Sequence, residues 1–573
     1  LQGERGYPVP PLELPQAEQE SALENLLENE SILLFVGRVQ TVQPSFALNK
    51  DNASDVAEIC RRLDGLPLAL ELAAARVKLL PPRAILTRLD DKLKLLTGGA
   101  RDLPTRHQTL RNTLEWSYDL LNQEEKILYA RLSVFVGGFT LEAAEAVCNQ
   151  DGRLDVLEGL TSLINNSLLR QEETADGEPR FGMLETIRAY ALERLAEIGQ
   201  MDVLRAQHAG YFAHLIANQA LLELYSAKAV YWLGWLEREH DNVRATLNWY
   251  LADPDSADLL ATLVFALTWF WDRRGYFSEG RLWAERALAS PALKPGGPAH
   301  ALALVSNGLL AVWQGEQQIG LAHLQESLTI WQRLEGQPWL APTLLANGIA
   351  LINMGRDEAA LPFLENARAI FEQANQPYFR VFTLVHLGNA ELGLGNPDQA
   401  RAWLEKAQPE ADAIGDRWLL SFALNNLGEV ARTLGQYDRA RTYYEQSESL
   451  LRSIDDKGDL ARLIHTLGYI AQYEEDFELA ESQFRKSLTL FRRLGNRRGI
   501  AECLAGLAGL KARQGQIEWG TIMLSAAESV LKITGGAWWP ADRVEVERNR
   551  EMLRAALPAG EFEKATKKGG AMN

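Results

Sequence analysis

A spacing of forty residues recurs through the second half of the chain and limits the folds that it can adopt. The pattern is clearest where Leu387 and Gly388 are followed by Gly395 and Ala400. The same register returns in the other units at Thr268, Gly275 and Gly280; Gly308, Gly315 and Gly320; Gly348, Gly355 and Ala360; Gly428, Gly435 and Ala440; Gly468, Glu475 and Ala480; and Ala508, Gly515 and Gly520. Seven copies without a slip in register predict a stack of structural repeats.

Each unit is expected to form two antiparallel helices. We count slot 1 of a unit from residue 381, so that small residues stand at slots 8 and 20 and let the helices approach closely. The glycine at slot 15 falls between the helices and suits the left-handed conformation that ends many helices. Leu387, Leu404 and Ala407 would fill the seam between the two helices. One helix pair cannot bury its apolar faces alone, so the units should stack into a superhelix.

The unit resembles the tetratricopeptide repeat, lengthened from about 34 residues to 40. The resemblance implies a right-handed α-solenoid over residues 256–536 that binds a protein, a peptide or a small-molecule ligand in its groove. A capping helix and a frayed tail from Gly560 would occupy residues 537–573. Slots 2, 5, 6, 9 and 12 normally face the groove, and here they include Phe382, His386, Asn389, Asn425, Asn426, Glu429, Arg432, His465, Tyr469 and Gln472. For any single one of these residues, an ordinary solvated face remains the alternative interpretation.

Composition excludes several classes of function. At 573 residues the chain is too long for one core, so several domains are expected. The net charge of -17 argues against a nucleic-acid-binding surface over most of its length. Three cysteines, Cys60, Cys148 and Cys503, lie far apart and offer no disulfide framework or metal site. The longest apolar run, of thirteen residues, is too short to cross a membrane. Because the scattered cysteines suit a reducing compartment, we expect a cytoplasmic protein.

Residues 16–107 read as a small helical domain. Asp64 and Gly65 break one helix, and Leu66-Pro67 starts the next with a proline in its first turn, where the missing N–H is tolerated. The helix that follows, through Arg76, consists almost entirely of small and apolar residues and should be buried. On the pattern alone, a tightly packed helix pair explains this stretch.

Residues 108–200 predict a winged helix. Helices are expected at about 110–121 and 123–133, from the N-cap Thr140, and over 154–165. Segments 167–170 and 180–183 would then form a β-hairpin before a last helix from Leu184. The helix at 154–165 stands in the position of a recognition helix but contains no lysine or arginine. Because phosphate contacts need cations, we expect no direct DNA binding.

The stretch from Ile59 to Ala69 resembles the GLPLA region of STAND ATPases, the class that includes NB-ARC proteins. Residues 116–121 and 183–188 resemble parts of the winged helix in the bacterial regulators that join such an ATPase to tetratricopeptide repeats. The resemblance implies an extended connector over 1–15, a helical ARC-like subdomain over 16–107, a winged-helix lid over 108–200 and a helical junction over 201–255. It implies the regulatory and sensor portion of a signal-transduction ATPase, typically a transcription regulator.

No P-loop of the form G-x-x-x-x-G-K-[ST] occurs in the sequence. The family places that motif upstream of the segment that matches Leu1, so we interpret the chain as a fragment with no catalytic residues of its own. ATP or ADP would then bind tightly, and a nucleotide-dependent oligomer would form, only in the full-length protein.

Two residues of a nucleotide site are implied by the resemblance. Pro67 matches the family proline that packs against adenine. Glu185 stands where plant and animal relatives have Met-His-Asp, but Leu184 replaces the phosphate-binding histidine. A helix N-terminal acid stabilised by the helix dipole explains Glu185 equally well.

Two functions therefore remain open. In the first, a ligand bound by the repeats releases the winged-helix lid from the upstream nucleotide-binding domain. In the second, the chain is a passive tetratricopeptide-repeat scaffold for protein–protein interaction.

Overall fold

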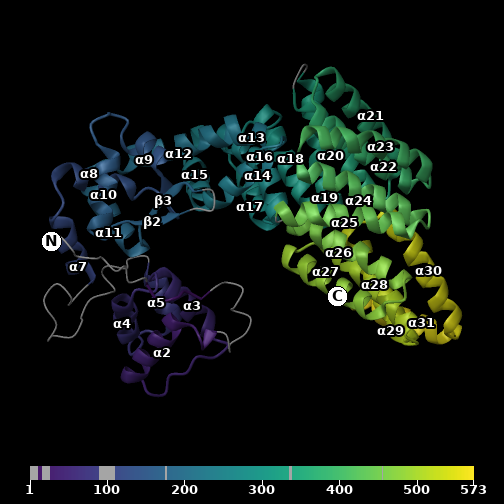
Figure 1. Cartoon of the computed structure of the whole chain (residues 1–573), viewed down its shortest axis with the longest axis horizontal. Coiled ribbons are helices and arrows are strands. Elements are labelled where there is room, and N and C mark those ends of the chain that lie inside the picture. The colour runs from purple at the N-terminus through teal and green to yellow at the C-terminus, as the bar shows by residue number, and fades with distance from the viewer. Residues whose placement is uncertain are drawn as a thin grey trace. The chain divides into compact units, whose positions relative to one another are not determined.

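The computed structural model describes residues 11–15, 26–89, 110–173, 177–334, 338–454 and 456–572 (Figure 1). The chain forms two compact units. The first consists of Leu1–Phe212 with Glu239–Thr246, and the second of Ala213–Arg238 with Leu247–Asn573. Both are mainly helical, and the described strands form one small sheet, so the predicted fold class is confirmed.

The first unit begins with the helices α2 (Glu30–Val42), α3 (Ala53–Arg62), α4 (Pro67–Arg76) and α5 (Pro82–Arg88). As predicted, Leu66 ends the turn and Pro67 is the first residue of α4. Asp64 and Gly65 both adopt positive φ, of 56° and 63°. The backbone N–H of Leu12 donates to the carbonyl oxygen of Gly65 at 3.1 Å, and a Cβ on Gly65 would lie 2.3 Å from the carbonyl oxygen of Leu12. The turn therefore needs glycine where the connector crosses it. The expected helix from residue 16 lies partly outside the described residues.

The winged helix is present as predicted. Its elements are α7 (Leu110–Asp119), α8 (Gln123–Leu132), β1 (Phe139–Thr140), α9 (Leu141–Cys148), α10 (Val156–Asn165), β2 (Arg170–Glu173), β3 (Pro179–Gly182) and α11 (Glu185–Glu197). The strands pair antiparallel in the order β1-β3-β2, with Gln171 opposite Phe181. Thr140 caps α9 by accepting from the N–H of Ala143 at 3.2 Å. Sequence reasoning found the β2–β3 hairpin but missed the two residues of β1, too few to leave a periodic pattern.

One asparagine anchors the turn that precedes β1. Asn242, in α15 (His240–Ala252), accepts from the N–H of Val136 at 2.8 Å and donates to the carbonyl oxygen of Gly138 at 2.9 Å. His208, in α12 (Met201–Leu215), lies 3.0 Å from the same side-chain oxygen. Glu239 pairs with Arg180 of β3. The side chains of Asn242, His208 and Glu239 thus find polar partners within the first unit, as burial requires.

The second unit contains the repeats. It opens with a π-helix (Ile216–Ala220), α13 (Leu221–Glu223), α14 (Ala229–Arg238) and a 3-10 turn (Pro254–Ser256). Seven helix pairs follow in its described residues: α16 (Ala257–Arg274) with α17 (Phe277–Leu288), α18 (Pro298–Gln314) with α19 (Gln317–Arg333), α20 (Leu340–Asn353) with α21 (Asp357–Gln373), α22 (Pro377–Gly393) with α23 (Pro397–Ile414), α24 (Arg417–Thr433) with α25 (Tyr437–Ile454), α26 (Lys457–Tyr473) with α27 (Phe477–Leu494), and α28 (Arg497–Arg513) with α29 (Ile517–Thr534). The predicted register is confirmed.

The small residues act as predicted. A Cβ on Gly388 would lie 2.9 Å from Cγ of Leu404, so only glycine lets α22 and α23 approach this closely. The residue at slot 15 adopts the left-handed backbone conformation, with a φ of 82° at Gly395. The sixth unit has Glu475 at this slot, and it adopts the same conformation with a φ of 65°. That glutamate carries a steric cost that glycine does not.

The stack of repeats closes on itself. Arg273, at the end of α16, pairs with Asp456, just before α26, at 3.2 Å, and both side chains are buried. The neighbouring Arg274 donates to the carbonyl oxygen of Ile454 at 3.3 Å. The first unit of the repeats therefore meets the sixth, 183 residues further along the chain. Closure turns the inner face of the repeats into an interior.

The end of the chain differs from the expected cap and frayed tail. Helix α30 (Pro540–Ala556) lies against α22, α24 and α28, and so packs on the inner face of the stack. The tail forms α31 (Ala559–Gly570), which packs on α29 (Figure 1). Ser525 of α29 donates to the carbonyl oxygen of Thr566 at 2.8 Å, and a Cβ on Gly569 would lie 2.2 Å from the carbonyl oxygen of Ile522. Because small residues such as Ser525 and Gly569 make this contact, the sequence of the tail shows no apolar periodicity that would predict it.

Replacing Glu475 by glycine should stabilise the second unit. The left-handed conformation at this slot costs a non-glycine residue about 1 kcal/mol, so we expect Glu475→Gly to raise the free energy of unfolding by about that amount. Denaturant unfolding measures the change. The matched control is Glu405→Gly, in the middle of α23 on an exposed face, which should lower the free energy of unfolding by about 1 kcal/mol. Equal effects of the two substitutions would contradict this account.

Candidate functional site

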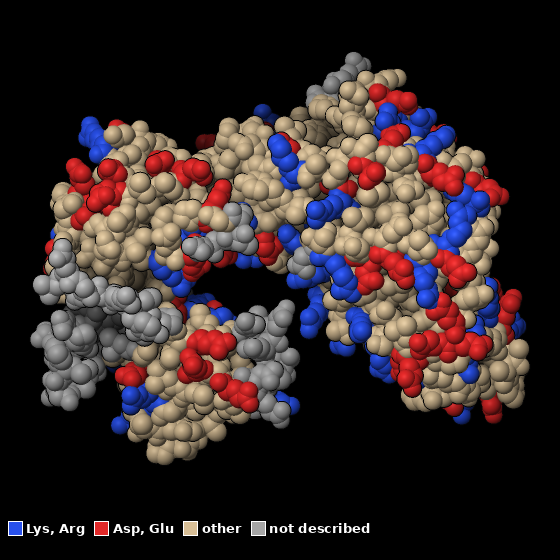
Figure 2. Space-filling view, in the orientation of Figure 1, with Lys and Arg blue, Asp and Glu red and all other residues tan. Residues whose placement is uncertain are grey.

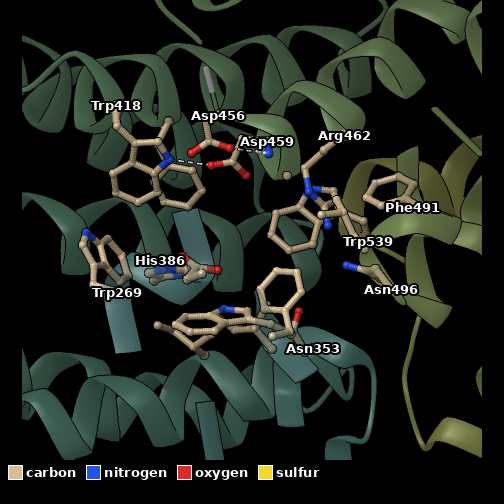
Figure 3. Close-up of a pocket in the computed structure, with 18 of the residues that line it drawn as sticks. Trp269, Asn353, His386, Trp418, Asp456, Asp459, Arg462, Phe491, Asn496 and Trp539 are labelled. Carbon is tan, nitrogen blue, oxygen red and sulfur yellow. Dashed lines mark hydrogen bonds between the residues drawn. The ribbon is translucent and has the colours of Figure 1, made fainter. Parts of the chain in front are cut away.

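A pocket of about 140 Å³ lies on the inner face of the repeats (Figure 3). Its side chains come from helices far apart in the sequence. Trp269 belongs to α16, His386 to α22, and Trp418 to α24, while Asp459 lies in α26. Trp539, just before α30, lines it as well. The pocket exists because the stack closes and brings residues of the first six repeat units together.

Aromatic rings form much of the wall. Trp418 stacks on Phe422 with ring centroids 5.1 Å apart, and Trp269 meets Trp418 edge-on at 5.2 Å. The guanidinium carbon of Arg273 lies 3.3 Å from the centroid of Trp418 and 4.4 Å from that of Trp269. A cation is thus already held by two indole rings at the edge of this cluster.

Three carboxylates also line the pocket, from Asp272, Asp456 and Asp459. Asp456 caps α26 by accepting from the N–H of Asp459 at 2.9 Å. Asp459 in turn accepts from the indole N–H of Trp418 (Figure 3). Burial raises the pKa of Asp456 to about 6, against the lowering effect of Arg273. Burial also raises the pKa of Asp272 well above its ordinary value.

The imidazole of His386 is a polar group in the pocket without a hydrogen-bond partner in the described structure, and the indole N–H of Trp539 is another. The His386 side chain is 6% exposed, and neither ring nitrogen has a hydrogen-bond partner among the described residues. Burial lowers its pKa to about 3, so the imidazole is neutral near pH 7. It therefore offers one N–H donor and one acceptor nitrogen toward the pocket.

Helix α30 covers part of the groove expected from the sequence. Arg432 pairs with Glu429 at 2.8 Å and also with Asp542 of α30. His465 approaches the same Asp542 carboxylate, with Nε2 and Oδ2 3.1 Å apart. These side chains are almost fully buried. The chain therefore places its own helix where a partner was expected.

The remaining predicted groove residues are buried too, so the alternative of an ordinary solvated face does not hold for them. The buried set is Phe382, Asn389, Asn425, Asn426, Tyr469 and Gln472. Of the ten predicted residues, Phe382 and His386 line the pocket. Partner binding by the set stays a prediction.

Sequence reasoning missed most of the pocket. Trp269 and Asp272 stand at slots 9 and 12 of the first repeat unit, so the slots used for the later units would have found them. Trp418 and Asp456 precede slot 1 of their units, and Trp539 lies outside the repeats. For these three no periodic signal exists.

The two residues proposed for a nucleotide site lie at helix N-termini of the first unit. Pro67 is exposed at the start of α4. Glu185 is the first residue of α11 and pairs with Arg188 at 2.8 Å. The N–H of Thr186 donates to the carboxylate of Asp64 at 3.3 Å, so the start of α11 lies near the turn before α4. Both explanations of Glu185 remain open.

The winged helix shows no cationic recognition surface on α10. The exposed residues of this helix include Leu157, which is 59% exposed, and Glu158. On the face drawn in Figure 2, acidic side chains lie over α8 and α10. This arrangement agrees with the expectation that the domain does not bind DNA directly, which remains a prediction.

The described part of the chain contains no helix both long and apolar enough to cross a membrane. Its three cysteines are buried and unpaired. Among the same residues, no group of three His, Cys, Asp or Glu side chains could hold a metal ion.

The His465–Asp542 contact should make stability depend on pH. Burial alone lowers the pKa of His465, but the Asp542 carboxylate outweighs it and raises the pKa to about 10. Because the pKa is raised above the ordinary 6.5, the stabilisation is complete below pH 6.5 and is lost as the pH rises through about 10. We expect His465→Gln to lower the free energy of unfolding by at least about 1.5 kcal/mol below pH 6.5.

Thermal unfolding of both proteins across this pH range measures the effect. The difference between them should shrink as the pH approaches 10. A difference that stays constant over the range would show that His465 is not charged in the folded protein.

Two protein families match parts of the chain. The winged helix-turn-helix domain family matches residues 121–196, and the tetratricopeptide repeat family matches residues 380–453. "Putative HTH-type transcriptional regulator Rv0890c" of Mycobacterium tuberculosis is 36% identical over 313 residues, or 53% of this chain and 35% of that protein. "Uncharacterized protein Rv0894" of the same species is 40% identical over 211 residues, or 36% of this chain and 50% of that protein. The chain thus spans about a third to a half of the length of these curated relatives.

Solved structures with a similar fold include a signal transduction ATPase with numerous domains (STAND) from Pyrococcus horikoshii that has a tetratricopeptide repeat sensor. It is 15% identical, with a TM-score of 0.45, and the match covers 95% of this chain and 74% of that one. NprR in complex with its cognate peptide NprX is 17% identical, with a TM-score of 0.42, covering 54% and 86%. The family and sequence matches confirm the resemblance expected from the sequence, to bacterial regulators that join a winged helix to tetratricopeptide repeats.

Proposed function

We propose that this chain is the sensor and regulatory portion of a bacterial STAND signal-transduction ATPase that regulates transcription. One chain joins a GLPLA-like helix, a winged helix and tetratricopeptide repeats, and relatives in sequence are named as HTH-type transcriptional regulators. The observation that carries the proposal is the pocket inside the closed stack, because its walls include residues of the first six repeat units.

A ligand in this pocket would act on the stack as a whole. Trp269 and Trp418 lie on helices of the first and fifth repeat units, and the Arg273–Asp456 pair joins the first unit to the sixth at the edge of the pocket. A ligand that binds between such helices changes the free energy of the closed stack relative to an opened one. The signal is then a shift in population between two states, set by how differently the ligand binds them.

The nucleotide belongs to the full-length protein in this proposal. ATP or ADP binds an upstream domain, Pro67 packs against the adenine, and Glu185 acts through Arg188 with which it pairs. The sequence has no P-loop, so this chain alone does not hydrolyse ATP. The winged helix serves as a lid on the nucleotide domain rather than as a reader of DNA.

A passive scaffold is the second candidate. It would present an open inner face to a protein partner, as other repeat stacks do. Here α30 lies on that face and Asp542 holds Arg432 and His465. This arrangement favours the sensor over the scaffold.

The full-length protein should bind ADP, and Pro67 should matter for it. Its reading frame is expected to encode a G-x-x-x-x-G-K-[ST] motif before Leu1. Replacing Pro67 by alanine removes an apolar ring from the adenine and should weaken ADP binding about tenfold, or about 1.4 kcal/mol. Calorimetric titration of the full-length protein measures the affinity for ADP. The oligomeric state is determined in the same samples.

Pro397→Ala is the matched control, since Pro397 is also the first residue of a helix but belongs to the repeats. It should leave ADP affinity unchanged. The absence of a P-loop from the full reading frame would refute the proposed function.

A further inference from the structure

We propose that the pocket in the repeats binds a cationic nitrogen group, with Asp272 as its charge partner. The inference deepens the proposed function by naming the class of ligand, and it rests on that function only for the step from binding to signalling. The candidate groups are a protonated amine and a guanidinium, carried either by a small molecule or by a peptide side chain.

One carboxylate in the pocket takes part in no direct ion pair. Arg273 pairs with Asp456 and acts on the neighbouring Asp272 only through its charge, while Asp459 accepts a hydrogen bond from the Trp418 indole. No hydrogen bond or ion pair joins the side chain of Asp272 to the rest of the described structure, although it lines the pocket. A carboxylate placed among buried groups needs a cation or a proton beside it.

The one arginine that lines the pocket is already engaged elsewhere. Arg462 lies 3.7 Å from Glu502 and 4.6 Å from the ring centroid of Trp539. It therefore does not compensate Asp272. An anionic ligand would be repelled by three aspartates here, and a neutral ligand would not compensate the charge of Asp272.

The aromatic wall suits the same ligand class. Trp418 and Trp269 hold the guanidinium of Arg273, which shows that these rings accept a cation in this setting. Trp313 and Phe382 also line the pocket. The pocket volume is about 140 Å³. It admits one compact head group and excludes a folded segment.

His386 supplies an independent sign of a missing ligand. Its buried, neutral ring points into the pocket and lacks partners for both nitrogens among the described residues (Figure 3). An acceptor nitrogen in a pocket that also holds carboxylates and aromatic rings matches a group that carries both positive charge and N–H donors. This feature favours amines and guanidinium over quaternary ammonium.

Tryptophan fluorescence offers a direct test, because four tryptophans line the pocket: Trp269, Trp313, Trp418 and Trp539. The chain is titrated with methylguanidinium, butylammonium and tetramethylammonium chlorides at constant ionic strength. We expect saturable binding of the first two, weaker binding of the third, and at least a tenfold loss of affinity in Asp272→Asn. Asp258→Asn is the matched control, because Asp258 is an exposed acid on the same helix.

A second variant distinguishes the loss of a binding group from the loss of the folded structure. His386→Phe keeps an aromatic ring but removes both nitrogens, so it should weaken methylguanidinium binding and leave tetramethylammonium binding unchanged. Thermal unfolding checks that both variants fold. Fluorescence changes that sodium chloride reproduces, or equal affinities in Asp272→Asn and the native protein, would overturn the proposal.

Two further experiments identify the source of the cationic group and test the cation site separately from the proposed function. A capped Gly-Arg-Gly peptide that binds more tightly than methylguanidinium identifies a peptide side chain, and the reverse identifies a small molecule. Both outcomes support a cation site. If the probes bind in the full-length protein without changing its ADP affinity, the cation site stands and the proposed switch fails.

Discussion

The buried ion pair between Arg273 and Asp456 decides what the repeats enclose. Two charges taken out of water lose hydration, and their attraction repays this only with further contacts. Arg273 gains such contacts from the faces of Trp269 and Trp418. Removing one member of a buried pair leaves the other uncompensated, at a cost of about 3–5 kcal/mol. The pair therefore fastens the first repeat unit to the sixth.

A second set of buried polar contacts lies on the inner face, where the Asp542 carboxylate of α30 contacts Arg432 and His465. Arg543, the next residue, pairs with Asp357 at 3.1 Å and donates to the carbonyl oxygen of Gly393. One helix thereby joins the third, fourth, fifth and sixth repeat units. Together these two sets of contacts hold the walls of a small pocket, which suits the detection of a small group better than the docking of a large partner.

Local rules predicted most of the fold. Glycines in a fixed register gave the seven helix pairs, and the N-cap Thr140 and the hairpin gave the winged helix. Pro67 started its helix as expected, because proline tolerates the first helical position. Each of these features depends on a few neighbouring residues, so a sequence can reveal it.

The closure and the pocket could not be predicted in the same way. Asp456 and Trp418 stand outside the slots that repeat, and Arg273 pairs with a residue 183 positions away. Asp542 is one charged residue in a polar helix, and nothing nearby in the sequence marks it for burial. Only His386 and Phe382 were found in advance, because they occupy periodic positions.

Hydrogen exchange on an Arg273→Gln variant tests the central claim that this pair closes the stack. Exchange rates are compared with the native chain in peptides that cover α16 and α26. Because the two helices support each other across the closure, we predict faster exchange in both, with the change in α26 arising 183 residues from the substitution. Faster exchange confined to α16 and its immediate neighbour α17 would contradict the account.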